Sequence, residues 1–394
     1  PDGSGLSQIS EIEGGIGGFS YAPDMSKVLY LKDVEIENPY AKLFDGLPMS
    51  SGRINNDLMY RHWDHWVDAY SHIFIADYGK GKITEGKDIM DDEPWGSPLS
   101  PFGGMEQITW SPDSKHIAYT SKKKTGMEYS VSTNSDIYLY NIENGNTANI
   151  SEGMMGLDMA PVFSPDGSMI AWESMKRDGY ESDQLRMMLY DVETGTAEDQ
   201  TADFDQNAGG YAWNGNEEIF FISAHLGSYE IFAYSLNDKQ FRQVTEGTHN
   251  YRSVSVLGDK LITTRQSMSM PTEIYAVNMA NGQDEQISFS NKELLDKITM
   301  GKVEKRWIKT TDGKDMLTWV IYPPHFDPAK KYPTLLYCQG GPQSMVSQFW
   351  SYRWNFQMMA ANDYIIVAPN RRGVPGFGQA WNEQISGDYG GQNM

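Results

Sequence analysis

The sequence predicts an all-β propeller of about seven blades over residues 1–301, followed by the first part of an α/β domain over residues 302–394. Three observations support this fold class. Two short motifs recur at blade-sized intervals, and after residue 302 the pattern changes to strand, glycine turn, helix and strand. The prediction leaves open whether the propeller lacks its first residues.

The first motif is a turn rich in serine, proline and aspartate that precedes a short alternating strand. Proline sets φ for the turn, aspartate bonds to the turn backbone, and glycine takes the left-handed position. Copies of the motif are Tyr21-Ala22-Pro23-Asp24, Trp110-Ser111-Pro112-Asp113 and Phe163-Ser164-Pro165-Asp166-Gly167, with a degenerate copy at Trp213-Asn214-Gly215.

The second motif is an aromatic and aliphatic strand that ends in a turn. Its copies are Ile73–Asp77, Ile137–Asn141, Met188–Asp191, Ile231–Ser235 and Ile274–Asn278. Their last residues are 64, 50, 44 and 43 residues apart. Steps of about 40–50 residues are typical of propeller blades, and the long first step leaves room for an insertion. Five or six blades can be traced in this way. An all-β sandwich with coincidental spacing is the alternative.

The pattern changes from Lys302 onward. Residues 303–310 and 316–322 predict two antiparallel strands, and 334–337 is a short apolar run of the kind buried on both faces of a sheet. A Gly340-Gly341-Pro342 turn, a helical stretch around 349–361 and an apolar strand at 364–368 follow. Strand, helix and strand in this order predict a βαβ unit.

Composition excludes several classes of partner. The net charge of −21 disfavours nucleic-acid binding, and no apolar run is long enough to cross a membrane. The only cysteine is Cys338, so the sequence predicts no intrachain disulfide. His62 and His65 are expected to pack among aromatic residues, because the sequence has no third metal ligand at a spacing typical of a metal site. We expect no metal and no organic cofactor.

The α/β segment carries motifs of a known family. Gln339-Gly340-Gly341-Pro342, Asn370-Arg371-Arg372-Gly373 followed by Gly376-Phe377-Gly378, and Gly387-Asp388-Tyr389-Gly390-Gly391 resemble the S9 prolyl-oligopeptidase family of serine peptidases. The run from Gly340 to Met394 and the segment Phe102–Gln107 resemble its bacterial dipeptidyl-peptidase 5 branch. The resemblance implies an incomplete α/β-hydrolase domain and a Ser-Asp-His triad.

The nucleophile of that triad does not occur in the sequence. Gly-x-Ser-x-Gly is found nowhere, and no histidine follows His325, whereas this fold places serine, aspartate and histidine in that order after the fourth apolar strand. We therefore expect the chain to be truncated before its catalytic serine and to be inactive by itself.

Four residues are candidate site residues by resemblance. The Gly341 N–H is assigned to an oxyanion hole, with Gly340 shaping the turn; a tight loop without a catalytic part is the alternative. Arg372 either holds a substrate carbonyl or supports its own loop. Glu93, in the acidic cluster Asp91–Glu93, is a candidate for binding the substrate amino group, and a solvated acidic surface is the alternative reading.

The resemblance implies a serine peptidase that releases dipeptides from the amino terminus of short peptides, with alanine or a hydrophobic residue before the cut. It admits a homodimer and a periplasmic or secreted location, with the cytoplasm as an alternative. Two other functions stay open. One is a TolB-like propeller that binds proteins, and the other is an acylaminoacyl peptidase or oligopeptidase of the same family.

Overall fold

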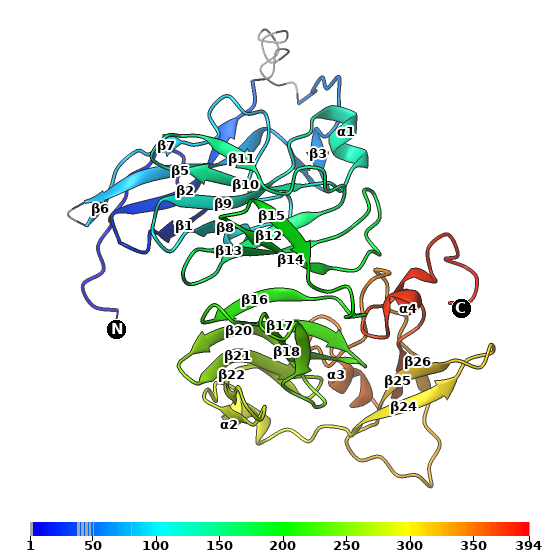
Figure 1. Cartoon of the computed structure of the whole chain (residues 1–394). Coiled ribbons are helices and arrows are strands. Elements are labelled where there is room, and N and C mark those ends of the chain that lie inside the picture. Colours follow the sequence, from blue (N-terminus) through cyan, green and yellow to red (C-terminus); the bar gives the residue numbers. More distant parts are fainter. Residues whose placement is uncertain are drawn as a thin grey trace. The chain divides into compact units, whose positions relative to one another are not determined.

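The computed structural model describes residues 3–37, 40, 43, 46, 49, 51–79 and 81–393. The chain divides into two compact units. Unit 1 consists of Pro1–Tyr180 and Met188–Glu198, and unit 2 consists of Glu181–Met187 and Asp199–Met394 (Figure 1).

Unit 1 contains three antiparallel sheets of the blade type. In the first, β1, β2, β5 and β6 pair in that order and β7 also pairs with β5; in the second, β8 to β11 pair in order, as do β12 to β15 in the third. The strands are β1 (Gly18–Tyr21), β2 (Lys27–Glu35), β5 (Ala69–Gly79), β6 (Lys82–Ile83), β7 (Lys87–Asp88), β8 (Ile108–Trp110), β9 (His116–Ser121), β10 (Asp136–Asn141), β11 (Thr147–Asn149), β12 (Asp158–Phe163), β13 (Met169–Ser174), β14 (Arg186–Asp191) and β15 (Thr196–Asp199).

The large sheet of unit 2 consists of two further four-stranded parts. β16 to β19 and β20 to β23 are each antiparallel, and a parallel pairing of Tyr229 in β18 with Asn250 in β20 joins them. The strands are β16 (Gly209–Asn214), β17 (Glu218–His225), β18 (Ser228–Ser235), β19 (Gln240–Gln243), β20 (Asn250–Leu257), β21 (Lys260–Ser267), β22 (Met270–Asn278) and β23 (Asp284–Gln286). The described residues thus contain five blade-type units before residue 301.

Both sequence motifs fall at fixed places in these units. The aromatic-aliphatic copies are the third strands β5, β10, β14, β18 and β22, and the Ser-Pro-Asp turns connect first to second strands. The third strand lies between two neighbouring strands, and in β10 the side chains of Ile137, Tyr138 and Tyr140 are buried. The predicted repeat is confirmed in five blade-type units among the described residues, while the expected number of about seven blades stays a prediction.

Side-chain hydrogen bonds hold the Ser-Pro-Asp turns. In the third sheet, the Ser168 N–H donates to Asp166 at 3.0 Å, and the Ser164 hydroxyl donates to the same carboxylate at 2.7 Å. The left-handed position is occupied by Gly167 with φ 76°, whereas Met25 and Ser114 take it in the first and second sheets with φ 60° and 62°. Only one of these three turns therefore has the residue that this conformation prefers.

Exchanging residues at this position should change stability in opposite directions. Gly167→Ala is expected to lower the free energy of unfolding by about 1 kcal/mol, because a Cβ disfavours positive φ. Met25→Gly should raise it by up to about 1 kcal/mol, since Met25 is half exposed and contributes little packing. Urea unfolding of both variants measures the two shifts. Shifts of the same sign would contradict this account.

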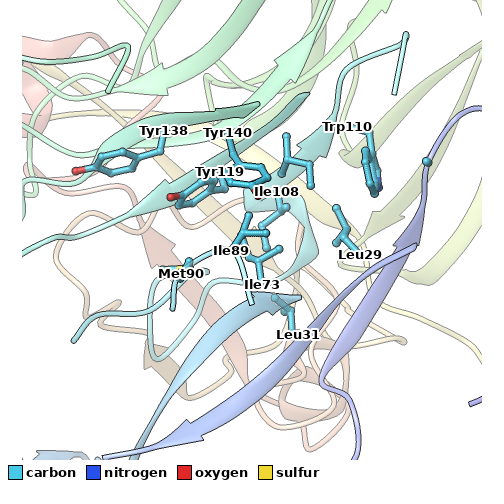
Figure 2. Packing of buried hydrophobic residues seen from close by; sticks show 12 residues of the cluster. Leu29, Leu31, Ile73, Ile89, Met90, Ile108, Trp110, Tyr119, Tyr138 and Tyr140 are labelled. Carbon is cyan, nitrogen blue, oxygen red and sulfur yellow. The ribbon is translucent and has the colours of Figure 1, made fainter. Parts of the chain in front are cut away.

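The sheets of unit 1 pack through their apolar faces. Figure 2 shows Leu29, Leu31 and Ile73 of the first sheet against Ile108 and Tyr119 of the second. The Trp110 indole adds a hydrogen bond of 3.2 Å to the carbonyl of Ser20, and so links β8 to β1. This core sets the face-to-face packing of the first two blade-type units.

A hairpin and two short helices lie outside the sheets. β3 (Arg61–His62) pairs with β4 (His65–Trp66), and α1 (Gly126–Val131) and α2 (Lys292–Leu295) are one to two turns long. His62 stacks on Tyr129 with 6.3 Å between ring centroids, which agrees with the predicted aromatic packing, whereas the His65 side chain is 85% exposed beside Asp64 and does not. Within the described part of the chain, no group of three or more His, Cys, Asp or Glu side chains is arranged so that it could hold a metal ion.

The last sheet has the predicted α/β order. β24 (Val303–Lys309), β25 (Asp315–Ile321), β27 (Ile365–Pro369) and β26 (Thr334–Leu336) pair in that order. β26 and β27 are parallel, with α3 (Phe356–Ala360) between them in sequence, so the βαβ unit is confirmed. α4 (Gln379–Glu383) follows β27.

Two details of this prediction were wrong. The helix is shorter than 349–361, because Asn355 caps it by accepting the Met358 N–H at 3.0 Å. The 334–337 strand is not buried, and Leu336 is 60% exposed. β26 is an edge strand, and α3 packs against β25 and β27. None of the helices among residues 3–37, 51–79 and 81–393 is long and apolar enough to span a membrane.

Candidate active site

The glycine turn predicted to bind an oxyanion follows β26. Gly341 has φ 137°, and a Cβ there would lie 3.0 Å from the Ser344 Oγ, so the position requires glycine. Gly340 has open space around it. Both residues are exposed, and no acceptor among the described residues takes either N–H. Two free amide donors at a strand end are suited to binding a developing negative charge.

Asn370 and Arg371 hold the chain on the two sides of the glycine turn. Arg371 donates to the carbonyl of Gln339 at 2.8 Å, directly before Gly340. Asn370 is fully buried and clamps Val346, accepting its N–H at 2.8 Å and donating to its carbonyl at 3.0 Å. Sequence reasoning found this motif but assigned these positioning roles to neither residue.

Arg372 is committed to partners within the protein. Its side chain is 4% exposed, Nε donates to the Gln384 side chain at 2.5 Å, and Nη1 donates to the carbonyl of Gln392 at 3.0 Å. Nη2 pairs with the carboxylate of Asp312. These contacts favour the loop-supporting alternative, while a role in holding a substrate carbonyl stays a prediction.

The Arg372 partner Asp312 should make stability depend on acid pH. Hydrogen bonds from Thr310 and Arg372 lower the pKa of Asp312 from 3.8 to about 2. A carboxylate whose pKa is depressed on folding contributes stability that is fully present above the unfolded value and is lost as pH falls toward the folded value. We expect Asp312→Asn to flatten the stability profile between about pH 4 and pH 2. Urea midpoints of the wild type and of Asp312→Asn across this pH range measure the difference. Equal slopes of midpoint against pH in the two proteins would contradict the role given to Asp312.

Glu93 lies in unit 1, and its charge is already matched. Its carboxylate pairs with Lys123 at 2.6 Å and accepts the Trp95 indole N–H at 2.8 Å. It lines neither of the two cavities described below. Binding of a substrate amino group by Glu93 therefore stays a prediction that rests on resemblance alone.

A cavity of about 510 Å³ lies within unit 2 and includes residues of both the blade strands and the α/β segment. Its size is typical of small-ligand sites. A second cavity, of about 240 Å³, lies in unit 1 and has no residue of the α/β segment. The larger cavity is therefore the candidate substrate space. It is lined by Leu185, Asn207, Gly209, Gly210, Ile222, Ala224, Tyr229, Asn250, Tyr251, Arg252, Gln266, Ser347, Phe349 and Pro375.

Asn250 joins the blade strands to the segment that follows the glycine turn. Its amide donates to the Ser347 hydroxyl at 2.8 Å and its carbonyl oxygen accepts the Gln348 N–H at 3.2 Å. The Gln348 side chain in turn accepts the Met268 N–H at 3.2 Å. No sequence motif marked Asn250 or Ser347, because their role depends on a contact about 100 residues apart in the chain.

Blade-type sheets followed by a parallel βαβ unit with a donor-bearing glycine turn define the class of α/β hydrolases that carry a propeller. Residues 106–298 match the family described as TolB beta propeller domain, and residues 350–394 match the prolyl oligopeptidase family. Both matches agree with the resemblance to the prolyl-oligopeptidase family, S9, that the motifs of the chain show.

Curated relatives place the similarity in the dipeptidyl-peptidase 5 branch. The chain is 51% identical to dipeptidyl-peptidase 5 of Porphyromonas gingivalis over 97% of its own length and 56% of that protein. It is 46% identical to the Porphyromonas endodontalis protein of the same name, over 100% of the chain and 57% of the relative. The chain thus spans little more than half the length of these relatives.

Solved structures share the fold at low identity. Pyrococcus horikoshii acylaminoacyl peptidase matches with a TM-score of 0.73 and 18% identity, over 96% of this chain and 54% of that one. A Mycobacterium tuberculosis puromycin-hydrolyzing peptidase matches with a TM-score of 0.61 and 13% identity, over 93% and 52%. These likenesses support the order of propeller and hydrolase domains.

Proposed function

We propose that the whole protein is a serine peptidase that releases dipeptides from the amino terminus of short peptides. The observation that carries the proposal is the Gly340-Gly341 turn, with two free N–H groups. Similarity to dipeptidyl-peptidase 5 over nearly the whole chain supports the dipeptidyl specificity.

In the proposed mechanism, the serine, aspartate and histidine of the triad lie outside these 394 residues. The serine hydroxyl attacks the scissile carbonyl carbon while histidine takes its proton, and the aspartate orients the histidine. The Gly341 N–H stabilises the oxyanion. The amine leaves with a proton from histidine, and water then hydrolyses the acyl-enzyme to release the dipeptide.

The proposal includes the domain boundary, the specificity and the location. We place the boundary at 301/302, because β24 begins a new sheet just after it. Alanine or a hydrophobic residue before the cut and a periplasmic or secreted location are proposed from the family resemblance, with the cytoplasm as the alternative location. A homodimer stays a prediction, and mass photometry of the purified protein tests it.

Chromogenic substrates of three kinds test the proposed activity. Dipeptidyl substrates with a free amino group should be cleaved, their N-acylated counterparts should not, and a serine-reactive phosphonate should abolish cleavage. Preference for the N-acylated substrates would indicate an acylaminoacyl peptidase instead. Absence of phosphonate-sensitive cleavage would favour a protein-binding propeller, which the TolB-type match of residues 106–298 also fits.

A further inference from the structure

The eight-stranded sheet of unit 2 is irregular where it borders the candidate substrate cavity. Its pairing register shifts at three places: in β16 after Gly209, in β20 after Tyr251 and in β21 after Arg265. Each shift lies at a residue that lines the cavity, namely Gly210, Arg252 or Gln266. β-Bulges redirect side chains and are frequent next to active sites.

Arg252 is the extra residue of the bulge in β20. Tyr251 pairs with Arg265 and Ser253 pairs with Thr264, so no residue of β21 is left opposite Arg252. Arg252 is exposed and is the one charged residue in the cavity lining. Among the described residues, none forms an ion pair or hydrogen bond with its guanidinium.

No acidic residue of the cavity lining compensates the charge of Arg252. Tyr229 and Arg252 line the same cavity, and the positive charge of Arg252 opposes the rise that burial causes in the pKa of the Tyr229 hydroxyl. Glu230, next to Tyr229 in the chain, is buried and accepts a hydrogen bond from Thr245. Glu230 does not line the cavity, so its carboxyl does not offset the charge of Arg252 there.

We propose that Arg252 binds a carboxylate of the peptide that occupies this cavity; the inference rests on the proposed peptidase function. The carboxylate comes either from the carboxyl terminus of a short peptide or from an acidic side chain. A guanidinium can hold a carboxylate by two parallel hydrogen bonds, and it does so more strongly where water is partly excluded.

The overall charge makes this single cation important. With a net charge of −21, the protein surface repels anions, so an acidic ligand needs a local positive group. The remaining polar groups of the lining are uncharged, including Asn207, Asn250, Gln266 and Ser347. The cavity therefore suits a ligand with one anionic end and an otherwise uncharged body.

Kinetics of the whole protein on three related peptides test the proposal. They also distinguish a carboxyl-terminal carboxylate from the carboxylate of an acidic side chain. The peptides are Ala-Ala-Ala, its carboxyl-terminal amide, and the amide Ala-Ala-Glu-NH₂. If the terminal carboxylate binds, kcat/KM for the acid should exceed that for the amide by about 10- to 100-fold. If a side chain binds, the glutamate-containing amide should show the gain instead.

Arg252→Gln should bring the ratio of anionic to neutral peptide close to one, and Arg252→Lys should restore part of it. Arg242→Gln is the matched control, because Arg242 belongs to the same sheet, is paired with Glu218 at 3.0 Å and does not line the cavity. It should keep the wild-type ratio. Equal rates on all three peptides in the wild type, or an unchanged ratio in Arg252→Gln, would overturn the proposal.

Binding measurements distinguish a failure of the proposed Arg252 carboxylate site from a failure of the proposed peptidase function. If no peptide is cleaved, calorimetric titration with the same three peptides still measures the carboxylate preference and its dependence on Arg252. Tighter binding of an anionic peptide that is lost in Arg252→Gln supports the carboxylate site without any peptidase activity. Equal or absent binding of all three peptides overturns it.

Discussion

Replacement of Gly341 by alanine should lower kcat of the whole protein by about 100- to 1,000-fold, with KM nearly unchanged. The reason is geometric. At φ 137° a side chain is strained, and its Cβ would lie 3.0 Å from the Ser344 Oγ, so the backbone must shift. That shift moves the Gly341 N–H away from the position where the oxyanion develops, which weakens an interaction made mainly in the transition state.

Gly340→Ala is the matched control for this prediction. A Cβ on Gly340 meets no atom within 4 Å, and the residue is not in the left-handed region. Its activity and its urea midpoint should therefore stay close to those of the wild type, whereas Gly341→Ala is expected to lose about 1 kcal/mol of stability and still be folded under assay conditions. Equal losses in the two variants, or no loss in Gly341→Ala, would show that the turn does not act through the Gly341 N–H.

Arg372→Ala is expected to lower the free energy of unfolding by about 3 kcal/mol. The guanidinium is 4% exposed and donates to Gln384, to the carbonyl of Gln392 and to Asp312. Truncation leaves these acceptors without their donor and opens a space where Arg372 also packs on Trp381, 5.1 Å from the ring centre. Urea unfolding measures the loss.

Arg353→Ala is the control for Arg372, because Arg353 is exposed and lies over the Trp354 ring. It should change stability by less than about 0.5 kcal/mol. A stability loss in Arg372→Ala without a matching rise of KM supports the loop-supporting role. The opposite result, a higher KM at unchanged stability, would support the substrate-carbonyl role that the resemblance also allows.

Local patterns predicted those parts of the fold that depend on local chemistry. Prolines and aspartates at residues 23–24, 112–113 and 165–166 set the turns, and the strands that are apolar on both faces, such as Ile231–Ser235, became the third strands of their sheets. The order of strand, turn, helix and strand after residue 302 was likewise visible. These features need few long-range contacts.

Features that depend on distant contacts could not be predicted. The apolar character of Leu335 and Leu336 indicated a buried strand, and β26 is exposed in a chain that spans little more than half the length of its relatives, with α3 packed against β25 and β27. Asn250 and Ser347 are ordinary polar residues in the sequence and acquire their role only through the hydrogen bond between them. The bulge at Arg252 can be recognised only from the pairing register of β20 and β21, which the sequence does not show.

The most direct test of the account is a crystal structure of the whole protein with a dipeptidyl phosphonate bound covalently to its serine. The phosphoryl oxygen stands in for the oxyanion. We expect it within about 2.7–3.1 Å of the Gly341 nitrogen. A phosphoryl oxygen bound by other donors, with the Gly341 N–H directed away from it, would contradict the account.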